Sequence, residues 1–283
     1  MTARPDLAPP DDDASGHDIE RAYANLRAGI ERALGSGRTE RVGPMMRIEV
    51  DAPQVDLLRW LANQHRVPRI YWADRDGTRR IAGVGCADRL DLEPGTTPAE
   101  LLRRVAGRLA GRDPALRYYG GFRFDPDAPM STRWAPFGRG WLVLPRFELV
   151  AQDDALRLAC NVFPGRDTAD RIIDELRGLA PAATDLPAPP ARAARADLPA
   201  EEAWRTMVDR AITELRTTSL RKLVLARRSD WQFDTPVSPL GLLSALAQHC
   251  GPCFRFCFDP DGESAFIGAT PERLFRRTGR DVW

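Results

Sequence analysis

The sequence predicts an α+β fold in which antiparallel sheets pack against helices. Two patterns lead to this prediction. Runs of alternating, β-branched and aromatic residues follow one another across short turn sequences, as in β-hairpins. Between them lie stretches whose apolar residues recur with the 3.6-residue period of an amphipathic helix. The chain has 283 residues, of which 43% are hydrophobic and 8% aromatic, and this composition excludes a disordered or fibrous protein.

Composition also limits the partners and the location of the protein. The 41 basic and 40 acidic residues give a net charge of +1, so no overall field exists to hold nucleic acid or an anionic membrane. No apolar run reaches about 18 residues, and the first residues lack the apolar segment of a signal peptide. Five cysteines, an odd number, argue against a secreted disulfide scaffold. We therefore expect a cytoplasmic protein.

The first part of the chain alternates helices with hairpins. A flexible leader is expected first, and the apolar spacing of Ala22, Leu26 and Ile30 then indicates a helix. The predicted elements are the leader 1–18, helix 19–34, strand 46–50, helix 55–64, strands 69–73 and 80–84, helix 97–109, strands 118–124, 140–149 and 155–163, and helix 167–179. Asp76-Gly77 supplies a hairpin turn between two of the strands.

The second part begins with a segment rich in Pro and Ala. Residues 181–202 are predicted to be an exposed connection within a single domain that spans residues 19–283. The predicted elements beyond it are helix 204–215, strand 222–227, helix 240–249 and the paired strands 254–258 and 264–268. The last residues resemble a hairpin interrupted after its turn, so we expect the C-terminal part of the domain to be missing.

Several familiar kinds of site are not supported by the sequence. Cys250, Cys253 and Cys257 have no second ligand cluster, so we interpret them as buried structural thiols rather than as a metal or redox centre. No G-x-S-x-G segment of a serine hydrolase occurs. The segment 83–85 lacks the third glycine of a dinucleotide-binding turn.

Lys222 is the first candidate for chemistry, because it is the only lysine among the 41 basic residues. Arginine can replace lysine on a solvated surface, but it cannot lose its proton near neutral pH, whereas a partly buried lysine can. A single retained lysine therefore indicates a position that requires deprotonation. The alternative is chance in an arginine-rich sequence.

Glu272 is the second candidate, on a predicted turn that follows a strand. A lysine base facing a glutamic acid could activate water on one side of a substrate and protonate a leaving hydroxyl on the other. The alternative is a surface ion pair or two unrelated residues.

Two segments resemble the paired motifs of a known family. Arg221–Arg227 (RKLVLAR) and Phe266–Phe275 (FIGATPERLF) are similar to motifs of the chorismate-utilising enzymes, and within them of the isochorismate synthases that serve menaquinone or siderophore synthesis. Weaker likenesses at 120–125 and 144–148 extend the resemblance over most of residues 40–280. It implies an anthranilate synthase component I-like fold.

The resemblance also implies roles for particular residues. Lys222 would be the base that activates water for attack at C2 of chorismate, and Glu272 the acid that protonates the departing C4 hydroxyl. The implied substrate-binding residues are Gly268, Ala269 and Thr270. Lysine favours water over ammonia as the nucleophile, so no glutaminase subunit is expected, and chorismate is the expected small-molecule partner.

Mg²⁺ is the cofactor that the resemblance implies. Its glutamate ligands are expected beyond Trp283, together with the arginine that meets a substrate carboxylate, so no metal ligand is assigned within the chain. Two alternatives to isochorismate synthase stay open: a salicylate synthase-like or other chorismate-utilising enzyme, and a non-catalytic truncated remnant.

Overall fold

The fold is described from a computed structural model of the chain, for residues 12–35, 44–180, 185–191, 193–273, 275–279 and 281–282. The chain divides into two compact units: a large one made of Met1–Pro187 and Pro239–Trp283, and a small one made of Ala188–Ser238. None of the helices in the described ranges combines the length and apolarity needed to cross a bilayer.

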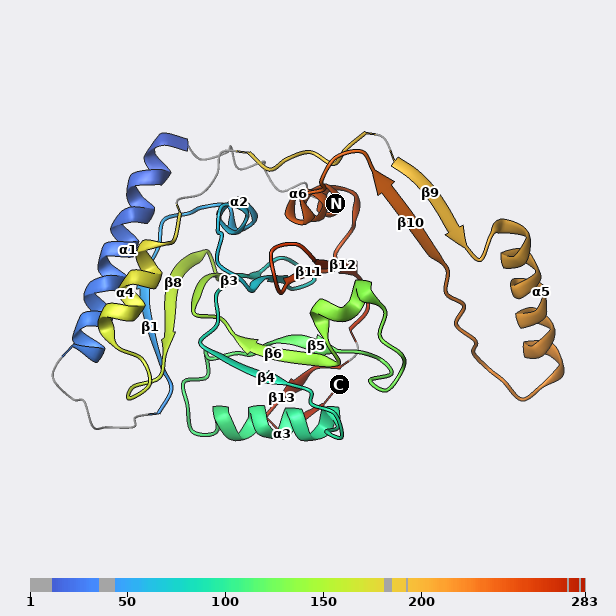
Figure 1. The fold of residues 1–283 in the computed structure, drawn as a ribbon, viewed down its shortest axis with the longest axis horizontal. Coiled ribbons are helices and arrows are strands. Elements are labelled where there is room, and N and C mark those ends of the chain that lie inside the picture. The colour runs from blue at the N-terminus through green and yellow to red at the C-terminus, as the bar shows by residue number, and fades with distance from the viewer. Residues whose placement is uncertain are drawn as a thin grey trace. The chain divides into compact units, whose positions relative to one another are not determined.

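Figure 1 shows the helices and strands of both units, which are numbered in chain order. The large unit contains α1 (Asp12–Leu34), β1 (Met46–Asp51), α2 (Leu57–Ala62), β2 (Arg69–Ala73), β3 (Arg79–Val84), β4 (Asp88–Asp91), α3 (Pro98–Leu109), β5 (Tyr119–Phe122), the 3-10 helix η1 (Thr132–Phe137), β6 (Gly140–Leu144), β7 (Phe147–Gln152), β8 (Ala155–Val162), α4 (Ala169–Arg177), α6 (Pro239–His249), β11 (Phe254–Asp259), β12 (Phe266–Thr270), β13 (Arg277–Thr278) and β14 (Asp281–Val282). The small unit contains β9 (Ala193–Leu198), α5 (Glu201–Thr217) and β10 (Arg228–Phe233).

A seven-stranded antiparallel sheet organises the large unit, in the order β1-β8-β7-β3-β2-β11-β12. Its register places Tyr71 of β2 opposite Ala82 of β3 on one side and opposite Cys257 of β11 on the other. Strand β11 from the end of the chain thereby lies beside β2 from its first third, and β12 pairs with the other edge of β11. This pairing brings the candidate turn at Glu272 next to the β2–β3 hairpin.

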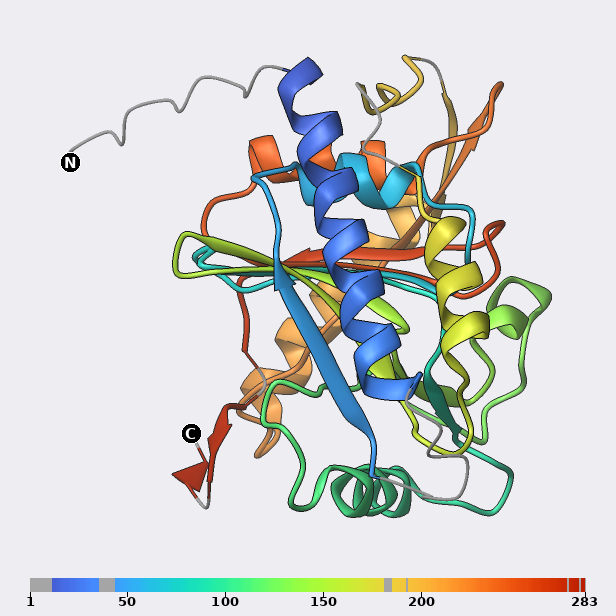
Figure 2. The same ribbon diagram turned by 90° about the vertical axis from the view of Figure 1, so that its left-hand side faces the viewer.

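Helices α1, α2, α4 and α6 cover one face of the sheet, where α1 and α4 lie side by side (Figure 2). Trp60 of α2 is fully buried there, and its indole N–H donates to the Tyr23 hydroxyl at 2.8 Å. Tyr23 in turn donates to the carbonyl of Ala180 at 3.1 Å. These bonds satisfy polar groups that burial would otherwise penalise.

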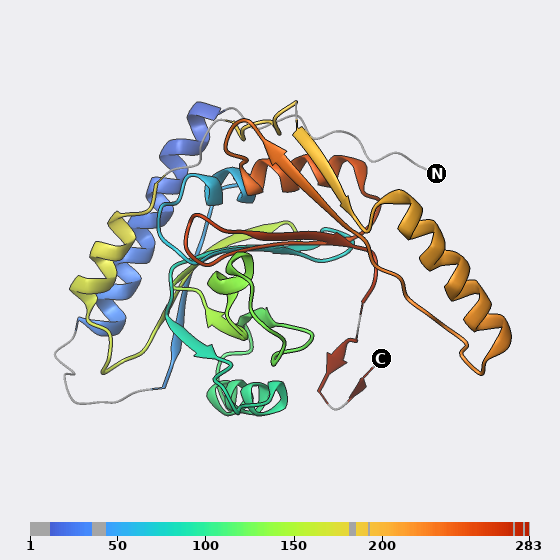
Figure 3. The ribbon, with the colours of Figure 1, turned by 45° about the vertical axis from the view of Figure 1, so that its right-hand side comes forward.

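A three-stranded sheet, in the order β4-β6-β5, packs on the opposite face (Figure 3). Trp141 and Val143 of β6 contact Ile70 and Ile81 of the large sheet. Helix α3 covers the far side of this small sheet through Leu101. The layers of the large unit therefore follow the order helices, seven-stranded sheet, three-stranded sheet and helix. The predicted α+β fold is confirmed.

Most predicted elements of the large unit form within a few residues of their predicted bounds, with two corrections. Residues 1–11 of the predicted leader 1–18 lie outside the described ranges, and α1 begins at Asp12 rather than at the predicted residue 19. The predicted strand 140–149 divides at Pro145-Arg146 into β6 and β7, which belong to different sheets.

The small unit differs more from the prediction. Strand β9 lies inside the segment 181–202 and pairs antiparallel with β10, so the prediction of an exposed connection without a packed element is wrong for Ala193–Leu198. Residues 181–184 and 192 of that segment lie outside the described ranges. The predicted strand 222–227 does not form: these residues run without regular structure between α5 and β10. A strand needs a partner for its backbone groups, and in the described part of the small unit β9 pairs with β10 instead.

Candidate functional site

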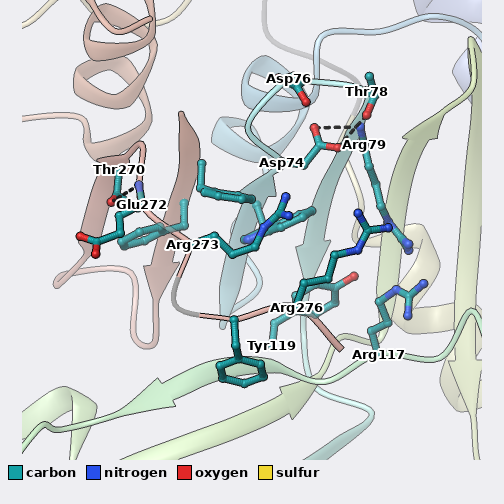
Figure 4. Close-up of a pocket in the computed structure, with 14 residues that line it drawn as sticks. Asp74, Asp76, Thr78, Arg79, Arg117, Tyr119, Thr270, Glu272, Arg273 and Arg276 are labelled. Carbon is teal, nitrogen blue, oxygen red and sulfur yellow. Dashed lines mark hydrogen bonds between the residues drawn. The ribbon is translucent and has the colours of Figure 1, made fainter. Parts of the chain in front are cut away.

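A cavity of about 830 Å³ opens in the large unit at the end of the β2–β3 hairpin (Figure 4). Its walls come from β2, β3, β11 and β12 of the large sheet, from the start of β5, and from the segment that follows β12. The lining residues are Trp72, Asp74, Asp76, Thr78, Arg79, Arg117, Tyr119, Phe254, Phe256, Thr270, Glu272, Arg273, Phe275 and Arg276. Its size is typical of small-molecule sites.

The turn after β12 contributes Glu272 to one side of this cavity. Thr270 ends the strand, and its hydroxyl accepts a hydrogen bond from the backbone N–H of Glu272 at 3.3 Å. This bond fixes the direction in which the chain leaves the sheet. The Glu272 side chain is exposed, so its carboxyl group can exchange protons with solvent or with a ligand.

Gly268 has a packing role in the same strand. A Cβ atom built on Gly268 would lie 2.3 Å from the ring of Phe256, its cross-strand partner on β11. Only glycine allows this ring to lie against the backbone. Side chains alternate along a strand, so Ala269 faces away from Gly268 and Thr270. Of the three predicted substrate-binding residues, the cavity is lined by Thr270.

Arginines form the other side of the cavity. In Figure 4, Arg79 and Arg117 lie on the side opposite Glu272, with Arg117 beside Tyr119. Arg117 as a whole is exposed, yet partial burial lowers the pKa of its guanidinium, and the like charge of Arg79 adds to this effect. Burial, followed by the charge of Glu148, raises the pKa of Tyr119 above its usual range.

The carboxylate of Asp74, in the turn between β2 and β3, accepts hydrogen bonds from groups of the same hairpin. Asp74 accepts hydrogen bonds from the Thr78 hydroxyl at 2.6 Å and from the backbone N–H of Arg79 at 3.1 Å. Glu148 pairs with Arg47 at 3.1 Å, and its charge also acts on Arg79 and Arg117. Among the described residues, therefore, no carboxylate lies within ion-pair distance of the guanidinium of Arg79 or Arg117.

Lys222 lies in the small unit, on the irregular segment between α5 and β10. The predicted strand would have placed Lys222 and Val224 on one face, but Val224 is 78% exposed and Lys222 is exposed as well. The partial burial expected around this lysine is absent from the described small unit. The two predicted catalytic residues thus belong to different units, whereas Glu272 and Thr270 share one cavity.

The cysteines are free thiols; Cys253 and Cys257 are buried as predicted, whereas Cys250 is only half-buried. Burial, with the charge of Asp259, raises the pKa of Cys257 to about 12, so this thiol is unreactive at neutral pH. Within the described ranges, no three His, Cys, Asp or Glu side chains gather as metal ligands.

Arg79, Arg117 and Tyr119 were not predicted from the sequence as part of a site. Arg79 lies about 40 residues before Arg117 and Tyr119 in the sequence, and 40 of the 41 basic residues are arginine, so no single arginine is distinguishable by type. The available signal was indirect: Arg79 follows the Asp76-Gly77 turn, and turns at sheet ends often line sites.

Comparisons with known proteins identify relatives in sequence and in fold. The isochorismate synthase 2 of Arabidopsis thaliana, a chloroplastic protein, is 27% identical over 82% of this chain and 47% of its own length. Isochorismate synthase MenF of Escherichia coli is 28% identical over 78% of this chain and 48% of its own length. The chain spans about half the length of these curated relatives.

The solved structure of E. coli MenF, described as a menaquinone-specific isochorismate synthase, matches with a TM-score of 0.72 and 25% identity over 92% of this chain and 57% of that one. The same mixed arrangement of helices and antiparallel sheets is therefore present in both. The model of the family described as "chorismate binding enzyme" matches residues 30–283. That match covers most of the chain, which consequently belongs to the chorismate binding enzyme family.

Proposed function

We propose that this protein is an isochorismate synthase, an isomerase that converts chorismate into isochorismate. The observation that carries the proposal is the likeness in fold to E. coli MenF over 92% of the chain, together with isochorismate synthases among its sequence relatives. The two motif segments, which contain Lys222 and Glu272, fit the same reaction.

In the proposed reaction, Lys222 accepts a proton from water as the water oxygen bonds to C2 of the ring. The ring double bonds shift, and the C4–O bond breaks. Glu272 donates a proton to the departing hydroxyl, which leaves as water. One water is consumed and one is released, so the net change is an isomerisation, and solvent restores the proton from Lys222 to Glu272.

Three features support the assignment of Glu272. It is exposed, it lines a cavity of suitable size, and its backbone is held by Thr270. Gly268 fits the proposed site as the residue that permits close packing behind the turn, and Thr270 as the residue that orients it. We assign Ala269 to the substrate-binding segment by its position in the motif.

Family members generally depend on Mg²⁺. The described residues do not gather a set of carboxylates that fits this ion, so no step above passes through a metal. Because the proposed nucleophile is water, the proposal requires no subunit that supplies ammonia.

Product analysis tests the proposal. The natural protein that contains residues 1–283 is incubated with chorismate and Mg²⁺, and the products are separated by chromatography. Isochorismate as the sole product is expected. Salicylate with pyruvate would identify a salicylate synthase-like enzyme instead, and no turnover would identify a non-catalytic remnant.

Glu272→Gln is the companion variant. The amide keeps the shape of the side chain but cannot donate a carboxylic proton, so turnover should fall by roughly 100-fold or more while chorismate still binds. Glu263→Gln, on the exposed turn between β11 and β12, is the matched control and should keep full activity. Equal activity of both variants would remove Glu272 from the mechanism.

A further inference from the structure

Two of the cysteines lie at the junction between α6 and β11. Cys250 follows the last residue of α6, and its backbone N–H donates to the carbonyl of Leu246 at 3.0 Å. The chain bends at Gly251 and Pro252, and Cys253 directly precedes β11. Helix α6 packs against β11 and β12, so the elements on both sides of this short connection belong to one packed structure. The backbone positions of both cysteines are therefore fixed by the fold.

The side chains of these two cysteines are in direct contact. Both are free thiols, and they are joined by a hydrogen bond between their side chains. Burial raises the pKa of Cys253, and this bond with Cys250 raises it further. Cys257 cannot replace either partner, because it lies four residues beyond Cys253, about 13 Å away along an extended strand and out of reach of a disulfide. The fold thus places one particular pair of thiols together.

The two thiols differ in their access to solvent. Cys250 is half-buried, whereas Cys253 is 6% exposed. A reagent in solution therefore reaches Cys250 first, and Cys253 is placed to react with Cys250. Metal binding is a poorer explanation of the pair. Two sulfurs supply only part of the tetrahedral ligand set of zinc, and within the described ranges no third ligand gathers with them.

We propose that Cys250 and Cys253 are a redox site that closes reversibly into an intrachain disulfide, with a small-molecule disulfide as the oxidant. The Cys250 thiolate attacks one sulfur of the oxidant, and the other half of the oxidant leaves as a thiolate. The Cys253 thiolate then attacks the Cys250 sulfur of the mixed disulfide and releases the second half. The protein loses two electrons and two protons, which convert the oxidant into two thiols.

This inference goes beyond the proposed function and does not depend on it, because neither cysteine lines the cavity that contains Glu272. It also revises the interpretation made from the sequence. Cys257 remains a buried structural thiol, whereas Cys250 and Cys253 become a reactive pair.

Oxidised glutathione is the probe, and peptide mass is the readout. The whole folded chain is incubated with it, quenched with acid, unfolded, alkylated with iodoacetamide and digested with trypsin. Cleavage after arginine yields the peptide 229–255, in which Cys250 and Cys253 are the only cysteines. This peptide should lose the mass of two hydrogen atoms and carry no alkyl group, and dithiothreitol should reverse the change. The next peptide, with Cys257, should be fully alkylated.

Single serine variants test the order of the two steps. Cys253→Ser should stop the reaction after the first step, with glutathione attached to Cys250. Cys250→Ser should leave Cys253 unmodified, because the buried thiol does not meet the oxidant. Cys86→Ser is the matched control, since it removes an exposed thiol outside the pair and should not change disulfide formation. Equal attachment of glutathione to the remaining thiol in both pair variants would overturn the site as proposed.

The unfolded chain provides a further comparison, because it has the same cysteine spacing without the fold. The oxidised fraction of the peptide 229–255 is measured over a series of ratios of oxidised to reduced glutathione. The folded protein should reach half oxidation at a ratio roughly tenfold lower than the chain unfolded in urea, because the fold raises the effective concentration of one thiol at the other. The proposal is overturned if the folded protein keeps both thiols reduced, or if the folded and unfolded chains are oxidised at the same ratio.

Discussion

At the residue scale, a buried ion pair secures the place where the chain passes from one sheet to the other. Arg146 follows β6 and precedes β7, and its guanidinium binds the Asp167 carboxylate through two contacts, at 2.7 and 3.1 Å. The same guanidinium donates to the carbonyl of Asn161 at 2.7 Å. Both charged side chains are almost fully buried, and loss of Asp167 would leave the guanidinium of Arg146 with Glu175, at 3.4 Å, as its remaining ion-pair partner.

Asp167 predicts a pH dependence of stability. Burial raises its pKa, but hydrogen bonds from Arg146 and from the backbone of Phe163 outweigh burial, so the pKa in the folded protein lies below the ordinary value of 3.8. A carboxyl whose folded pKa is depressed stabilises the protein above its unfolded pKa. That contribution is lost as the pH falls through the folded pKa.

Asp167→Asn therefore should reduce the free energy of unfolding by roughly 3 kcal/mol at pH 7. The difference from the natural protein should shrink as the pH drops below about 4. Urea unfolding at several pH values measures this difference in unfolding free energy. Asp170→Asn, on the exposed start of α4, is the control. A difference that stays constant down to acidic pH would contradict this role of the Asp167 charge.

At the element scale, local signals predicted the helices and hairpins well. A helix was predicted over 97–109, and the structure shows a reciprocal capping box between Thr97 and Glu100 at the start of α3. The division between β6 and β7 was not predicted. An apolar sequence has the same pattern whether it forms one strand or two strands that belong to different sheets. What divides the run is the distant partner Asp167, which no local pattern contains.

Because the Phe256 ring of β11 lies close to Gly268 of β12, we predict that Gly268→Ala destabilises the protein. The added methyl group would meet the Phe256 ring at 2.3 Å, so the ring must move, at a cost of about 1–3 kcal/mol in unfolding free energy. Gly121→Ala, in β5, is the control, because nothing lies within 4 Å of a Cβ built there. Equal stability of the two variants, by thermal or urea unfolding, would contradict the packing role.

At the scale of the whole molecule, the sequence predicted antiparallel sheets packed against helices but not the separate compact unit at 188–238. The segment 222–227 has the apolar alternation of a strand, yet alternation specifies only which side chains share a face. A strand also requires a neighbour, and the described residues of the small unit provide none for it. For the site, the sequence identified Glu272 and Thr270, whereas the arginines opposite them depend on tertiary packing.

We propose that the chain functions as a single domain despite its two units. The small unit buries little apolar surface of its own, with Ala211 as the buried apolar residue of α5. Units of this size are marginal when isolated. Limited trypsin digestion should cut first at exposed positions such as Arg221 and Arg227 and leave the large unit intact. Accumulation of two separately stable fragments would contradict a single domain.

The central claim is that Lys222 acts as the base, and a comparison of variants at this position tests it most directly. Conversion of chorismate to isochorismate is measured with Mg²⁺ for Lys222→Arg, Lys222→Ala and the neighbouring control Arg221→Ala in the natural protein that contains these residues. If Lys222 must accept a proton, arginine cannot replace it, and both Lys222 variants should lose roughly 100-fold or more of the rate while the control stays active. An active Lys222→Arg variant would mean that a positive charge suffices there, and would contradict the role of Lys222 as base.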